Sequence, residues 1–116
     1  SEADVNQQVD FQRAVRDKLS EAYRFENALE MEVESLKSKT SRSASEESRL
    51  KTLEVVLSQV QTEEGIYMQP MLADQWRYLY SMMNQADQVP GRDALQRFTA
   101  LETELQRLKS QAGLNE

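Results

Sequence analysis

The chain contains no cysteine and no histidine in its 116 residues. This absence excludes zinc fingers, haem attachment motifs, redox dithiols, thiol nucleophiles and serine–histidine triads, because each needs at least one of these residues. The sequence also has no glycine-rich phosphate loop and no Asp/Asn loop of the calcium-binding type. No two residues form a credible acid–base pair. We therefore predict no catalytic, cofactor-binding or metal-binding residues, and we expect the protein not to be an enzyme.

Basic clusters and long apolar runs are also missing. The formal net charge is −6, and the basic residues are scattered, whereas nucleic-acid binding needs a Lys/Arg-rich surface. No apolar run approaches the roughly 20 residues that a membrane-spanning helix requires. We expect no nucleic-acid binding, no membrane insertion and no small-molecule substrate. A protein partner, including a basic one, remains compatible with this composition.

Turn-forming residues are scarce, with three glycines and two prolines, and the hydrophobic pattern is helical throughout. The breaks predict helices over about residues 4–37, 46–64, 70–86 and 92–112. A chain of this length suits one domain with one modest core, and short connections favour antiparallel neighbours. The predicted fold class is all-α: an antiparallel up-and-down bundle of four helices. We expect residues 1–116 to form a single domain that belongs to a larger protein.

Local signals mark several helix ends. Ser43 and Glu46 have the spacing of a capping box before the second helix, and Gly65 ends that helix. Pro70 suits the first turn of the third helix. Gly113, followed by an apolar residue, predicts a Schellman-type stop for the fourth helix.

The apolar stripe of the first helix is interrupted at one position. Glu26 occurs where the stripe expects an apolar residue, and Phe25 is positioned to fill the gap. The simpler interpretation places Glu26 at the edge of the bundle. The alternative is a buried functional carboxylate. The other residues of this stripe are Val15, Leu19, Ala22, Leu29, Val33 and Leu36.

One stretch, PMLADQWRYLYSMM at residues 70–83, carries the only Trp, two of the four Tyr and three of the five Met. At about 100° per residue its apolar side chains form two stripes, so the apolar arc is wider than a surface helix needs. Either this helix is enclosed between neighbours, or the second stripe is an exposed docking surface. The apolar loop before the helix could extend such a surface. The candidate partner-binding residues are Tyr67, Met68, Met71, Tyr78 and Met82.

Residues 69–108 combine a proline that opens a helix, a Tyr-Leu pair, an Ala-Asp before a proline-containing turn, and a last helix with Phe and spaced Leu. These residues are Pro70, Leu72, Tyr78, Leu79, Ala86, Asp87, Pro90, Phe98, Leu101, Leu105 and Leu108. In this pattern the stretch resembles the C-terminal helical region of bacterial secreted proteins that carry sortilin-like β-propellers, often labelled glycosyl-hydrolase-like. The resemblance implies an extracytoplasmic, periplasmic or secreted accessory domain beside a propeller, and it brings no catalytic residues.

Three functions fit the sequence. The leading one is a non-catalytic accessory or interaction domain that docks on a neighbouring domain or protein through the apolar helix 70–86. A second is a self-assembling, homodimeric coiled-coil module formed through helix 4–37, whose first half could lack a partner inside the bundle. A third is a helical appendage of an enzyme whose active site lies in another domain.

Overall fold

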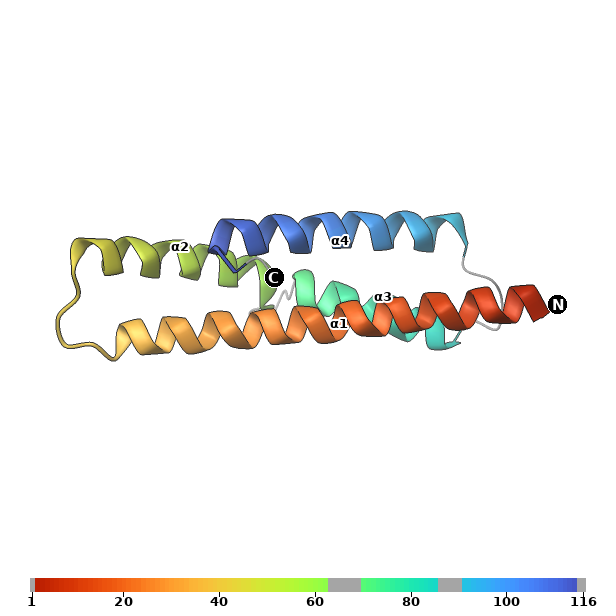
Figure 1. Ribbon diagram of the computed structural model, residues 1–116, viewed down its shortest axis with the longest axis horizontal. Coiled ribbons are helices and arrows are strands. Elements are labelled where there is room, and N and C mark those ends of the chain that lie inside the picture. The colour runs from red at the N-terminus through yellow and green to blue at the C-terminus, as the bar shows by residue number, and fades with distance from the viewer. Residues whose placement is uncertain (1, 63–69, 86–90, 115–116) are drawn as a thin grey trace.

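The computed structural model describes residues 2–62, 70–85 and 91–114, and all regular structure within these ranges is helical. Four helices follow one another: α1 (Glu2–Lys37), α2 (Ala44–Val60), α3 (Leu72–Gln85) and α4 (Arg92–Ala112). They form an elongated molecule of 62 × 35 × 18 Å (Figure 1). The predicted all-α fold of four packed helices is confirmed.

The chain goes up, down and up along the long axis of the molecule. α2 and α3 run back along α1 one after the other, and α4 returns beside them (Figure 1). Antiparallel packing therefore holds for α1 with α2 and for α3 with α4, but α2 and α3 point the same way. Helix length explains this difference. α1 has 36 residues, whereas α2 and α3 have 17 and 14, so two helices in series are needed to cover α1.

The break between α2 and α3 is closed by a side chain. α2 ends at Val60, because the Gln61 backbone is extended, with φ −97° and ψ 129°. The Met71 N–H then donates a hydrogen bond to Thr62 Oγ1 at 3.0 Å, which ties the end of α2 to the start of α3. The predicted end of this helix near residue 64 is too late, and Gly65 lies outside the described residues.

Pro70 lies before α3 and not in its first turn, as the sequence had suggested. The helix begins at Leu72, and the Met71 carbonyl accepts the first helical hydrogen bond, from the Gln75 N–H at 2.9 Å. The Pro70 carbonyl accepts from Gln75 Nε2 at 2.8 Å. Since Met71 is fixed by its bond to Thr62, the helix begins two residues later than a proline at its first position would place it.

The other predicted boundaries agree to within two residues. The capping box before α2 is confirmed: Ser43 Oγ accepts from the Glu46 N–H at 3.1 Å, and the Ser43 N–H donates to Glu46 Oε1 at 3.0 Å. α4 ends in a Schellman motif, in which Gly113 has φ +69° and the Leu114 N–H donates to the Lys109 carbonyl at 2.9 Å.

All four helices contribute to one continuous apolar core. An aromatic group holds three of them together: the Trp76 ring of α3 meets Phe98 of α4 edge-on at 5.3 Å, and Phe98 meets Phe11 of α1 at 5.6 Å. The buried core residues are Val15, Ala22, Phe25, Leu29, Val33, Leu36, Leu50, Leu53, Val56, Val60, Leu72, Ala73, Trp76, Leu79, Met83, Leu101, Leu105, Leu108 and Ala112.

The first half of α1 has partners inside the bundle. Val15 is fully buried, Leu19 packs against the core, and Gln12 Nε2 donates to the Met83 carbonyl of α3 at 2.9 Å. The expectation that this half could lack an intramolecular partner is wrong, because α3 and α4 extend far enough along α1 to cover it.

The two described glycines at the ends of α4 give a matched test of the Schellman stop. Gly113→Ala should lower the free energy of unfolding by about 1 kcal/mol, because an L-residue is strained at positive φ. Gly91 has φ −75° and a Cβ added there meets nothing within 4 Å, so Gly91→Ser should leave stability equal or slightly higher. Urea unfolding of both variants measures the difference, and equal stabilities would contradict the assigned stop.

Candidate docking surface and charged clusters

The second apolar stripe of α3 is partly open to solvent. Tyr78 and Met82 lie one helical turn apart and are 48% and 49% exposed, while Met71, just before the helix, is half-buried. The opposite face of α3 is buried through Leu72, Trp76, Leu79 and Met83. α3 therefore packs against α1 and α4 and also presents an apolar surface, and docking through that surface stays a prediction. Tyr67 and Met68 lie outside the described residues.

The surface formed by Tyr78 and Met82, here called the α3 patch, has a charged flank. The Arg77 guanidinium lies 5.4 Å from the centre of the Tyr78 ring, and Arg77 Nε pairs with Asp74 Oδ1 at 3.3 Å. A ring, a thioether and an adjacent ion pair suit protein recognition, since aromatic residues, Met and Arg are enriched at interfaces. Other large apolar side chains are also exposed, on other helices: Val9, Tyr23, Met31, Val55 and Leu95.

An ion pair that the sequence analysis missed joins a half-buried glutamate of α1 to a buried lysine of α4. The Lys109 side chain is only 8% exposed, and its Nζ donates to Glu21 Oε1 at 2.5 Å. Glu21 also pairs with Lys18 at 3.2 Å, and Lys18 pairs with Glu102 at 3.4 Å. Burial opposes the Glu21 charge, but the two lysines outweigh it and lower the pKa of Glu21. The network fixes α4 against α1.

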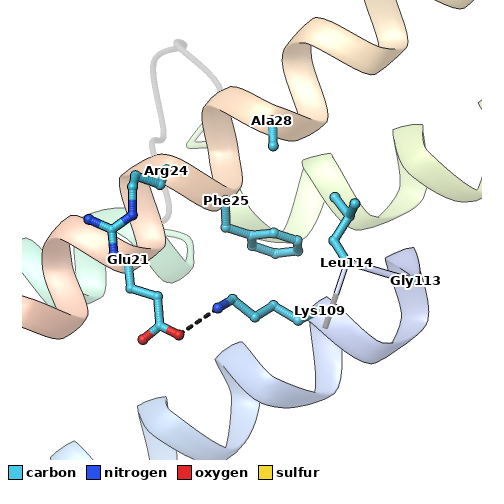
Figure 2. Close-up of a pocket in the computed structure, with 7 residues that line it drawn as sticks. All are labelled: Glu21, Arg24, Phe25, Ala28, Lys109, Gly113 and Leu114. Atoms are coloured by element: carbon cyan, nitrogen blue, oxygen red, sulfur yellow. Dashed lines mark hydrogen bonds and ion pairs between the residues drawn. The ribbon is translucent and has the colours of Figure 1, made fainter. Parts of the chain in front are cut away.

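Beside this ion pair lies a cleft of about 460 Å³ (Figure 2). Its α1 wall includes Glu21, Arg24 and Ala28, and its α4 wall includes Lys109. Leu114 closes one side, because the Schellman motif turns the chain back after α4. The cleft therefore exists because α4 stops where it does. Nothing in the hydrophobic periodicity pointed to it.

A second charged contact ties three helices together through one arginine. Arg49 of α2 forms a bidentate ion pair with Glu32 of α1, in which Nε donates to Oε2 at 2.7 Å and Nη2 donates to Oε1 at 3.2 Å. Its Nη1 donates to the Ala112 carbonyl, at the end of α4, at 2.6 Å. The hydrogen bonds to Glu32 raise the pKa of Arg49. This guanidinium is structural, because its hydrogen bonds satisfy a carboxylate and a helix-end carbonyl.

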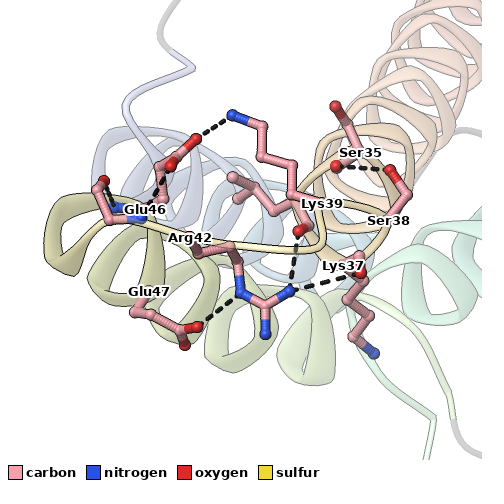
Figure 3. Close-up of polar contacts among 9 residues, drawn as sticks. Ser35, Lys37, Ser38, Lys39, Arg42, Glu46 and Glu47 are labelled. Atoms are coloured by element: carbon pink, nitrogen blue, oxygen red, sulfur yellow. Dashed lines mark hydrogen bonds and ion pairs between the residues drawn. The ribbon is translucent and has the colours of Figure 1, made fainter.

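The turn between α1 and α2 is closed by a third set of polar contacts (Figure 3). Arg42 Nη1 donates to the Leu36 carbonyl at 3.1 Å, at the end of α1, and its Nε donates to Glu47 at 2.7 Å. Lys39 pairs with Glu46. Hydrogen bonds from Lys39 and from the backbone of Ser43 lower the pKa of Glu46 to about 2. These contacts explain the turn fully and suggest no chemistry beyond it.

Glu26, the interruption in the α1 stripe, is half-buried at the edge of the bundle, and Phe25 is 4% exposed. The simpler interpretation is therefore the correct one for its position. Burial raises the pKa of Glu26, and the nearby charges of Glu30 and Asp74 raise it further. The charge of Glu26 is therefore disfavoured where it lies, and no partner in this group suggests an acid–base role for it.

Neither metal chemistry nor a membrane span is supported by the described residues. Within residues 2–62, 70–85 and 91–114, no group of three or more acidic side chains is arranged to hold a metal ion. In the same part of the chain, no helix combines the length and apolarity needed to cross a bilayer.

Comparisons of the chain with protein-family models, curated proteins and solved structures found no match. The resemblance to the helical region of propeller-carrying secreted proteins therefore stays a prediction.

The Glu21–Lys109 pair should respond differently to the loss of each partner. Glu21→Ala leaves a buried ammonium without its acceptor and should cost about 2 kcal/mol. Lys109→Met keeps the packing of the aliphatic stem, and Glu21 keeps Lys18, so the cost should stay below about 1 kcal/mol. Urea unfolding of both single variants and of the double variant checks this. Equal costs for the two single changes would show that the Lys109 ammonium is not the buried partner that needs Glu21.

Glu26 should destabilise the fold at neutral pH. Its folded pKa is raised, so the folded state holds the proton more tightly than the unfolded state. The penalty is present above the folded pKa and disappears as the pH falls to the unfolded value. Glu26→Gln should therefore raise the free energy of unfolding at about pH 7 and have little effect at about pH 3. The control is Glu34→Gln at an exposed site on the same helix. A gain independent of pH would refute the electrostatic cause.

Proposed function

We propose that this chain is a non-catalytic helical interaction domain that docks on a neighbouring domain or partner protein through the α3 patch. One observation supports the proposal above others: Tyr78 and Met82 lie together and half-exposed on a helix whose opposite face is completely used by the core. A helix that needs only to pack has no reason to place an aromatic ring and a thioether side by side in solvent. Interfaces favour both residue types.

The rest of the molecule supports a binding role more than a catalytic one. The charged clusters close turns, tie helices together or fix a helix end, and each side chain in them has a structural partner. The α3 patch has no such internal role. Arg77 and Asp74 flank it, so a partner would meet an apolar centre with a polar edge, as in most protein interfaces.

Self-assembly through α1 is the weaker alternative. Its premise was a first half of α1 without partners, and that half is packed against α3 and α4. The resemblance over residues 69–108 supports a different setting, in which the domain sits beside a β-propeller outside the cytoplasm and the patch faces that neighbour. A helical appendage of an enzyme would use the patch in the same way.

Paired serine substitutions test the docking proposal. Tyr78→Ser with Met82→Ser removes the patch, and Met31→Ser with Val55→Ser removes two other exposed apolar side chains, 64% and 52% exposed, on α1 and α2. Each exposed change should alter stability by about 0.5 kcal/mol or less, which circular dichroism and urea unfolding verify.

Each purified variant is then immobilised and exposed to an extract of the source cells, and retained proteins are identified by mass spectrometry. We expect a partner that the unmodified chain and the Met31/Val55 control retain and the Tyr78/Met82 variant loses. A partner that all three retain equally would refute docking through the α3 patch.

A further inference from the structure

The cleft between α1 and the end of α4 is large enough to hold a small molecule. Its volume of about 460 Å³ lies within the range of known ligand pockets. Glu21, Arg24, Phe25 and Ala28 follow an i, i+3, i+4, i+7 pattern, so they share one face of α1. Ala28 is exposed and small, which leaves the space open. Figure 2 shows the Phe25 ring between the α1 and α4 walls.

The charges around the cleft favour an anion. Among the described residues, two cations, Arg24 and Lys109, and one carboxylate, Glu21, line the cleft, although the chain as a whole has a net charge of −6. Glu21 is already engaged by Lys109 and Lys18. Arg24 is exposed and has no ion pair within the described residues. A guanidinium at this position can hold a carboxylate through two parallel hydrogen bonds.

The remaining wall is apolar. Phe25 lines the cleft from the core and is only 4% exposed, and Leu114 is half-buried where the chain turns back after Gly113. A ligand that satisfied Arg24 alone would leave Ala28 and Leu114 in contact with water. A ligand with an apolar body next to its charge would cover them as well.

We propose that this cleft binds a small amphipathic anion, a carboxylate attached to an aryl or short alkyl group. Arg24 holds the carboxylate, and Phe25, Ala28 and Leu114 contact the apolar part. Lys109 and Glu21 form a neutral pair at the inner wall and keep α1 and α4 at the spacing that the ligand needs. The cleft is formed by α1 and α4, whereas the α3 patch is on α3, so either site can exist without the other.

Phenylbutyrate is a suitable probe, and the uncharged phenylbutanol is its matched control. The whole chain, labelled with ¹⁵N, is titrated with each compound, and amide shifts are followed by NMR. The variants are Arg24→Gln, which removes the charge, and Ala28→Trp, which fills the space. Arg13→Gln is the control, because Arg13 is another exposed arginine of α1 and does not line the cleft.

We expect saturable shifts at residues 24–28 and 109–114 with phenylbutyrate. Loss of the charge-assisted hydrogen bonds should weaken binding about tenfold, both for Arg24→Gln and for phenylbutanol. Arg13→Gln should bind as the unmodified chain does, and Ala28→Trp should abolish the shifts. Three results would overturn the proposal: no saturable shifts at the cleft, equal affinity for the acid and the alcohol, or full affinity in Arg24→Gln. Shifts confined to Tyr78 and Met82 would place the probe at the α3 patch and would likewise refute binding in the cleft.

Discussion

The length of α1 is the constraint on which the rest of the structure depends. Its apolar stripe runs from Val15 to Leu36, and a helix of 36 residues spans about 54 Å at 1.5 Å per residue. No other described helix is long enough to cover it. α2 covers one half of α1 and α3 covers the other, which leaves a break between the end of α2 and the start of α3. α4 spans that break: its Arg107 Nη2 donates to Gln59 of α2 at 2.9 Å, and its Phe98 packs on Trp76 of α3.

Long cationic side chains fix this arrangement at the places where helices end or cross. Arg49 joins Glu32 of α1 to the Ala112 carbonyl at the end of α4, and Arg42 donates to carbonyls at the end of α1. Lys109 pairs with Glu21 between the two longest helices. In a chain with excess acid, each of these three cations gains from a nearby carboxylate. The exposed pairs contribute little to stability, whereas Lys109 is buried, so losing its partner Glu21 is costly.

Helix ends that depend on neighbouring residues were predictable from the sequence, whereas contacts between residues far apart in the sequence were not. The capping box at Ser43 and the Schellman stop at Gly113 depend on residues within a few positions of each other, so spacing alone identifies them. The early end of α2 depends on Thr62 reaching Met71 across the break. The Glu21–Lys109 pair joins residues 88 positions apart, and only the packed bundle brings them together. Lys109 follows Leu105 by four residues, which was the one available sign that it is buried.

The α3 patch is exposed because of the residue that anchors the helix. Trp76 is fully buried against Phe98, and this contact sets the rotation of α3 about its own axis. Residues two and six positions later point about 200° and 240° away from it, at 100° per residue. Tyr78 and Met82 therefore cannot join the core while the indole does. Loss of Trp76 would free the helix to rotate, so the residue that stabilises the bundle also orients the surface proposed to bind a partner.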